Sequence, residues 1–126
     1  MKPYIEWIKR ARSAYNYAKA EIDDYVTYED KCFQAQQAVE KAIKGLIIFY
    51  GEKHEHTHDI ERLIKALTKH VEIDESIKES IVLSIYAFHT RYPGDYHDIT
   101  EEEYQKAIEI AGNCLAWVEK KIEEMK

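Results

Sequence analysis

The sequence contains few residues that interrupt helices and no pattern that indicates strands. Among 126 residues there are 4 glycines and 2 prolines, and no segment alternates apolar and polar residues as a half-buried strand does. No linker, internal repeat or low-complexity segment divides the chain. These absences exclude a β-rich fold and a string of tethered domains, so we expect residues 1–126 to form a single helical domain.

Cysteines and long apolar runs are also scarce. The two cysteines, Cys32 and Cys114, both fall within helical patterns, where a buried thiol is the simplest interpretation and a metal-binding or catalytic role is the alternative. The longest apolar run, from Leu46 to Tyr50, is far shorter than the roughly 20 residues that cross a bilayer. The first residues contain no apolar signal core. We therefore expect a cytoplasmic protein with reduced thiols and no membrane association.

An excess of positive charge is missing as well. Lys and Arg number 18 against 24 Asp and Glu, so the formal net charge is -6. This balance excludes a general nucleic-acid coat, which needs concentrated cations, and we expect no DNA partner. A cluster of basic residues near the start of the chain is interpreted as the solvated face of a helix. These residues are Lys9, Arg10, Arg12 and Lys19.

Helical periodicity extends along most of the chain. Apolar residues over 4–25 and again over 104–125 recur in alternating steps of four and three, which predicts two long helices packed nearly antiparallel to others. Thr27 and Asp30 predict the start of a second helix that ends at Tyr50. The predicted apolar stripes are Tyr4, Ile8, Ala11, Tyr15, Ala18, Ile22 and Tyr25, and then Tyr104, Ile108, Ala111, Leu115, Val118, Ile122 and Met125.

Two more helices are expected between these. Thr57 is predicted to cap a short helix, and Asp74 or Ser76 to start a fourth long helix that is apolar around much of its circumference. Together the patterns predict an all-α, antiparallel up-and-down bundle of four long helices and one short helix. In the short helix, Ile60, Leu63, Ile64 and Leu67 share one face, and in the fourth, Ile77, Ile81, Ile85 and Phe88 are expected to point inward.

Two polar groups of residues have more than one interpretation. Gln36, Gln37 and Glu40 lie among alanines and are interpreted as surface groups, with a polar seam as the alternative. His54, His56 and His58 would point to one side of an extended loop, where three imidazoles could bind zinc. Because nothing nearby except Glu55 and Asp59 could complete a ligand set, we interpret the segment as a polar loop and expect no metal to be needed for folding.

An elbow between the fourth and fifth helices carries the strongest candidate for a functional site. Pro93 and Gly94 break the helix near Arg91 or Tyr92. Thr100, followed by Glu103, resembles a capping box and predicts the start of the next helix. Arg91 offers a planar fork of donors suited to phosphate, and His97 can exchange a proton near neutral pH.

Three segments, in this order, resemble the HEPN domain family (higher eukaryotes and prokaryotes nucleotide-binding). Phe33 to Leu46 is similar to the family's second helix, Thr57 to Leu63 to its Thr-His helix start, and Thr90 to Gly94 to the Arg-Tyr-Pro elbow of small free-standing prokaryotic members. The resemblance covers nearly the whole chain. It implies a helical homodimer, often encoded beside a minimal nucleotidyltransferase.

The resemblance also implies a chemistry for the elbow. Catalytic members are metal-independent ribonucleases with an arginine, four to six residues and then a histidine, and Arg91 and His97 fit this spacing. His97 would act as general base or acid, and Arg91 would stabilise charge on the phosphoryl group. Active members usually have a small polar residue where this chain has Tyr92, and the tyrosine that is adenylylated in some toxin members would stand at Ile99.

Three functions stay open on this basis. The first is a nucleotide- or partner-binding module, the companion of a minimal nucleotidyltransferase, and the second is a ribonuclease toxin of a toxin–antitoxin pair with Arg91 and His97 as catalytic residues. The third is a helical interaction protein without ligand. We expect no cofactor, a nucleotide or RNA as the ligand, and a homodimer built on the side of the fourth helix with its two elbows near a shared cleft. The expected ligand-binding residues are Arg91, Tyr92, Asp95, Tyr96 and His97.

Overall fold

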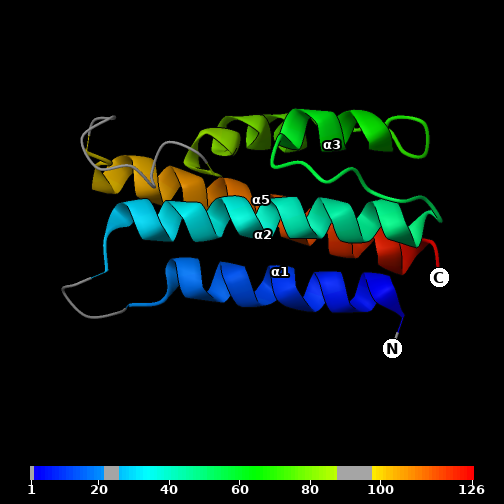
Figure 1. Ribbon diagram of the computed structural model, residues 1–126, viewed down its shortest axis with the longest axis horizontal. Helices are drawn as coiled ribbons and strands as arrows, with labels where there is room; N and C mark the ends of the chain where they lie inside the picture. The colour runs from blue at the N-terminus through cyan, green and yellow to red at the C-terminus, as the bar shows by residue number, and fades with distance from the viewer. Residues whose placement is uncertain (1, 22–25, 88–97) are drawn as a thin grey trace.

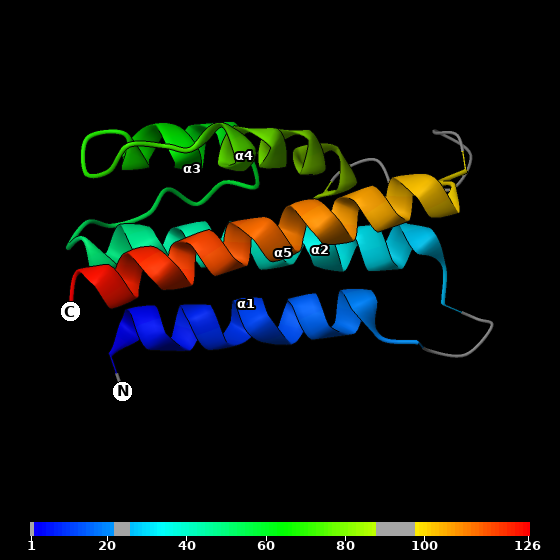
Figure 2. The ribbon, with the colours of Figure 1, turned by 180° about the vertical axis from the view of Figure 1, so that it is seen from behind.

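A computed structural model describes residues 2–21, 26–87 and 98–126 of the chain. All regular structure in these residues is helical. α1 runs antiparallel to α2 and α5, which run in the same direction (Figure 1). α2 (Tyr28–Phe49) lies in the middle and packs against α1 (Pro3–Lys19) on one side and α5 (Glu101–Glu124) along its length. α3 (Ile60–Leu67), α4 (Glu75–Lys78) and η1 (Glu79–Ala87) form the layer opposite α1 (Figure 2). The predicted all-α helical bundle is confirmed.

α1 is shorter than its apolar stripe predicted. It begins with Pro3, whose fixed φ and missing N–H suit a first helical turn, and it ends at Lys19, after which Ala20 is extended. The expected end at residue 25 is therefore wrong. Residue 21 and two of the next three positions are acidic, and carboxylates at a helix C-terminus oppose the helix dipole. Two predicted stripe positions, Ile22 and Tyr25, lie outside the described residues.

α2 is the central helix and begins where the sequence predicted. The hydroxyl of Thr27 accepts a hydrogen bond from the Asp30 N–H at 3.1 Å, and the chain turns at Gly51, which has a φ of 87° that favours glycine. Gly45 lies against α1, where a Cβ atom would come within 2.8 Å of Ile8 Cδ1. The absence of a side chain at Gly45 therefore permits the close approach of α1 and α2.

The caps of the next two helices correct one prediction and confirm another. Asp59, not Thr57, caps α3 by accepting from the Glu61 N–H at 3.0 Å, while the Thr57 hydroxyl accepts from the Asp59 N–H. The expected Thr57 cap is therefore wrong by two residues. Asp74 caps α4 as expected, by accepting from the Ser76 N–H.

The predicted fourth long helix is one α-helical turn, α4, followed by the 3₁₀-helix η1. Ile77, Ser80 and Leu83 are buried, which is the spacing of three residues per turn of a 3₁₀-helix. The inward position expected for Ile85 is therefore wrong: its exposed fraction is 51%. Phe88 lies outside the described residues.

α5 begins at the predicted cap, because the Thr100 hydroxyl accepts from the Glu103 N–H at 3.1 Å. Its predicted stripe is buried or half-buried from Tyr104 to Ile122. Met125 departs from the stripe with an exposed fraction of 61%, since the helix ends one residue before it. None of the described helices is long and apolar enough to cross a membrane.

Candidate functional site

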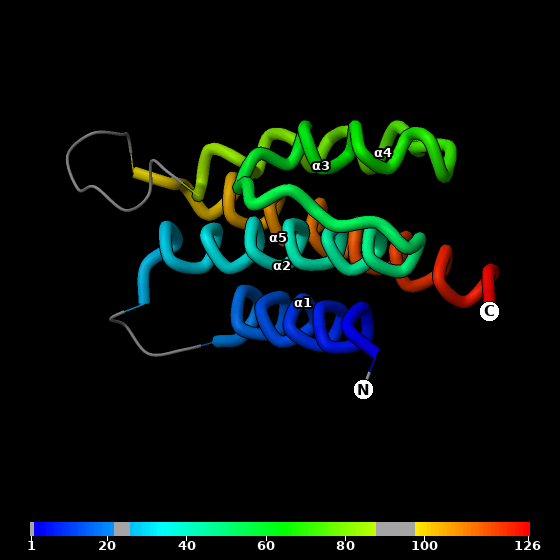
Figure 3. Tube along the Cα trace, turned by 45° about the vertical axis from the view of Figure 1, so that its right-hand side comes forward, coloured from blue at the N-terminus to red at the C-terminus, as the bar shows by residue number. Residues whose placement is uncertain are grey.

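The described residues on both sides of the predicted elbow are anchored to the bundle. Ala87, the last residue of η1, is buried, and Ile99 is buried with its N–H donating to Glu29 Oε1 at 3.1 Å. The two ends of the intervening segment are therefore held at one end of the bundle (Figure 3). The predicted ligand-binding residues, including the predicted catalytic pair Arg91 and His97, lie outside the described residues: Arg91, Tyr92, Asp95, Tyr96 and His97.

Two stacked aromatic rings join α2 to α5 at this end of the bundle. The rings of Tyr28 and Tyr104 are stacked with centroids 5.1 Å apart, and Lys31 Nζ lies 5.1 Å from the Tyr104 ring. The Tyr104 hydroxyl donates to the Ala18 carbonyl at 2.6 Å, which joins the start of α5 to the end of α1. This end of the molecule is thus fixed by contacts between α1, α2 and α5.

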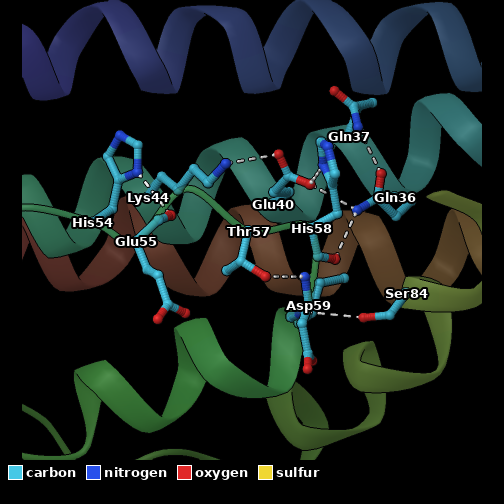
Figure 4. A network of polar contacts seen from close by, with 11 residues as sticks. Gln36, Gln37, Glu40, Lys44, His54, Glu55, Thr57, His58, Asp59 and Ser84 are labelled. Atoms are coloured by element: carbon cyan, nitrogen blue, oxygen red, sulfur yellow. Dashed lines mark hydrogen bonds and ion pairs between the residues drawn. The ribbon is translucent and has the colours of Figure 1, made fainter. Parts of the chain in front are cut away.

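A network of buried polar side chains lies in the middle of α2 (Figure 4). After Tyr50 the chain returns along α2 in an extended path (Figure 1). The ten residues from 40 to 50 rise about 15 Å in a helix, and an extended segment from 51 to 58 spans up to about 26 Å, so it can return to Glu40. His58 Nδ1 lies 2.7 Å from Glu40 Oε1. The return of this segment therefore brings a histidine to the middle of α2.

Glu40 is the centre of this network. Its side chain is 4% exposed, and it pairs with the ammonium of Lys44 at 2.9 Å and accepts from Gln36 Nε2 at 2.9 Å. Gln37 donates in turn to Gln36 Oε1 at 2.7 Å, and the side chain of His58 remains 55% exposed at the surface. The network therefore connects the buried side chains of α2 to the exposed imidazole of His58.

The sequence interpretation of these residues as surface groups is wrong for two of them. Gln36 is fully buried and Glu40 is 3% exposed, whereas Gln37 is half-buried. The alternative interpretation, a polar seam, is the one observed. The sequence did indicate that Gln36, Glu40 and Lys44 share one face of the helix, because they are four residues apart, but this spacing does not show that the face is buried.

The charge state of Glu40 follows from its partners. Burial alone would raise the pKa of its carboxyl, but hydrogen bonds from Lys44, Gln36 and His58 lower that pKa below the ordinary value of 4.5. The carboxylate is therefore ionised at neutral pH and already binds three protein donors. In this geometry Glu40 positions neighbouring side chains and does not act as a free acid or base.

This lowered pKa predicts a pH-dependent contribution to stability. A carboxyl whose pKa is lower in the folded state stabilises the fold above its unfolded pKa, and that contribution is lost as pH falls through the folded pKa. The difference in unfolding free energy between the parent and Glu40→Gln should therefore be constant near pH 7 and shrink below about pH 4.5. Denaturant unfolding of both proteins from pH 3 to 7 measures it. A difference that stays constant over the whole range would contradict this account.

The three histidines proposed from sequence as metal ligands face different neighbours. The His54 ring lies edge-on to Trp7 and to His56, with centroids 4.9 and 5.4 Å away, while His58 contacts Glu40. In the part of the chain that the structure describes, no three His, Cys, Asp or Glu side chains are grouped to hold a metal ion.

Comparisons with known proteins match nearly the whole chain. A family model described as HEPN domain matches residues 4–121. The structure of TT1696 from Thermus thermophilus is similar with 32% identity and a TM-score of 0.84, covering 96% of this chain and 99% of that one. The structure of ST0689, described as an archaeal HEPN homologue, has 29% identity and a TM-score of 0.73, covering 97% of this chain and 99% of that one. The comparison with curated proteins gave no significant match.

Proposed function

Since the chain belongs to the HEPN domain family, we propose that it is a nucleotide- or partner-binding module and the companion of a minimal nucleotidyltransferase. The elbow is the proposed binding site, with Arg91, Tyr92, Asp95, Tyr96 and His97 as its ligand-binding residues. The anchored residues on both sides of the elbow, Ala87 and Ile99, support a site at this end of the bundle.

The charge of the described residues next to the elbow carries this proposal. Asp98, Glu101 and Glu102 are exposed at the start of α5, and exposed carboxylates repel the phosphates of a long RNA. They attract a protein surface of opposite charge, because complementary potentials speed and orient association. A partner protein, or a compact nucleotide bound beside it, suits this surface better than an extended polyanion.

A ribonuclease is the second candidate function. The specific observation in its favour is the spacing of Arg91 and His97 in a member of a family whose catalytic members use this pair. Tyr92 stands where active members usually carry a small polar residue, and Ile99 stands where some toxin members carry the tyrosine that is adenylylated. For these reasons we rank this function second. It would need neither a cofactor nor a metal.

The binding proposal predicts a stable complex with a minimal nucleotidyltransferase encoded beside this chain. Changing Glu101 and Glu102 to glutamine should slow association by about tenfold or more, within the range for electrostatic steering. Association rates at low and high salt measure this effect, and calorimetry with ATP tests for a nucleotide site that Arg91→Ala should weaken.

The control is the same change of charge at the other end of α5, Glu123→Gln with Glu124→Gln. These two carboxylates are also exposed, so a loss of affinity in both double variants would reflect net charge alone. Absence of complex and of ATP binding would refute the binding proposal.

We also propose that the chain forms a homodimer on the side of α4 and η1. Val82 and Ile85 are 60% and 51% exposed on η1, and a partner subunit would remove this apolar surface from water. Sedimentation should give a dimer at micromolar concentration and a monomer for Val82→Glu with Ile85→Glu. Met125→Glu, at an equally exposed apolar residue far from η1, should leave the dimer intact. A monomeric parent would contradict the proposal.

We propose a cytoplasmic location, in which both cysteines would stay reduced. Cys32 and Cys114 are buried free thiols. Burial raises the pKa of each to about 12, with the charges of Glu103 and Glu29 as further causes at Cys32. Both therefore remain protonated thiols at neutral pH and fit the role of small core residues.

A further inference from the structure

A hollow of about 640 Å³ lies at the opposite end of the molecule from the start of α5. It is formed between the connection that joins α3 to α4 and the C-terminal half of α5. Figures 1 and 3 place this connection beside the C-terminal end of α5. Small-molecule sites in proteins are typically about 300–1,000 Å³, so the hollow has the size of a ligand site.

The floor of the hollow is apolar. Val71, Ile73 and Trp117 line it, and all three are half-buried side chains packed against the core. A half-buried tryptophan offers a large flat surface to an apolar or aromatic group. The floor therefore favours a ligand with an apolar body.

The rim of the hollow carries both signs of charge. Lys78 and Lys121 line it together with three carboxylates. Lys121 Nζ lies 3.6 Å from Glu124 Oε2 and 5.9 Å from the centroid of the Trp117 ring. Two of these carboxylates have partners: Asp74 Oδ1 accepts from the Ser76 N–H at 3.1 Å, and Glu75 pairs with Lys78 at 3.1 Å across exposed side chains. Glu72 has no ion-pair partner among the described residues.

We propose that this hollow binds a small zwitterion with an apolar body, about the size of a dipeptide. A dianion or trianion would meet three carboxylates against two lysines and would be repelled. A simple cation would offer no acceptor to Lys78 and Lys121, whose present ion pairs lie near the surface and can be shared with a ligand carboxylate. A zwitterion matches both signs at once. Its carboxylate binds Lys78 and Lys121, its ammonium binds Glu72, and its side chain lies on Trp117.

The test uses leucyl-phenylalanine as the probe. Only two tryptophans are present in the chain, so Trp7→Phe leaves the fluorescence of Trp117 as the sole signal. The free dipeptide should perturb this fluorescence. N-acetylation and C-terminal amidation each remove one charge from the dipeptide. Each should therefore weaken binding at least about tenfold, the loss expected for one charge-assisted contact. The proposal would be overturned if all three forms bound equally or if ATP bound more strongly. It would also be overturned by the absence of a response at about 10 mM dipeptide, a concentration at which even a site of millimolar affinity would be mostly occupied.

Matched variants separate the site from general charge effects. Glu72→Gln and Lys78→Met change exposed residues, so folding should be unaffected, and each should weaken binding of the free dipeptide about tenfold. Glu109→Gln and Lys106→Met change an exposed ion pair elsewhere on α5 and should leave binding unchanged. Equal losses in both pairs of variants would also overturn the proposal.

Discussion

Glu40→Ala should lower the free energy of unfolding by about 3–5 kcal/mol, the range for removing one partner from a buried ion pair. The substitution leaves Lys44, whose side chain is 8% exposed, with an uncompensated charge in the interior. It also removes an acceptor from the buried amide of Gln36 and from the ring of His58. Chemical denaturation at pH 7 measures the loss.

The matched control is Glu55→Ala, the same substitution in an exposed ion pair with Arg62. Exposed pairs contribute little because water screens them, so this variant should unfold close to the parent. Combining Glu40→Leu with Lys44→Met should recover part of the loss, since apolar side chains can replace a buried ion pair. A loss at Glu40 no larger than that at Glu55 would show that the network is not a stabilising element.

His97→Ala should lower any RNA cleavage by the chain about 10²–10⁴-fold, the contribution of a general acid or base. Arg91→Ala should also abolish most of the activity, because it would remove charge stabilisation from the phosphoryl group. Activity of the parent should persist in a metal chelator. Cleavage of a single-stranded RNA with both variants, in chelator, measures these effects.

His56→Ala and Arg10→Ala serve as matched controls, since each removes the same side chain from an exposed site elsewhere. Activity that survives His97→Ala and Arg91→Ala but falls in the controls would move the site away from the elbow. A parent that cleaves no RNA would leave binding as the function of this chain.

Local signals in the sequence predicted the helix starts well. Thr27 and Thr100 cap α2 and α5 as expected, because each cap depends only on a hydroxyl and the next three residues. The Asp59 cap was not predicted because Thr57 and Asp59 are both residues that can cap a helix. Which of them caps α3 depends on where the chain returns to α2.

Features that depend on distant residues could not be predicted in the same way. Burial of Glu40 requires the return of residues 51–58 along α2, which no local pattern in α2 encodes. Ile85 is exposed because its segment forms a 3₁₀-helix that packs on α2 and α5. The apolar pattern alone does not distinguish this helix from an α-helix. The predicted elbow residues lie outside the described part of the chain, so that site stays a prediction.

The contacts of α5 have a consequence for the order in which the bundle assembles. The pair Glu40–His58 closes 18 positions, whereas Tyr104–Ala18 closes 86 and Arg12–Glu119 closes 107. Loop closure over 107 positions costs about 1.5 kcal/mol more than over 18, by the logarithmic dependence on length. The α2–α3 unit can therefore form before α5 packs, so a nascent chain leaves the face of α2 that contacts α5 uncovered until α5 has been synthesised.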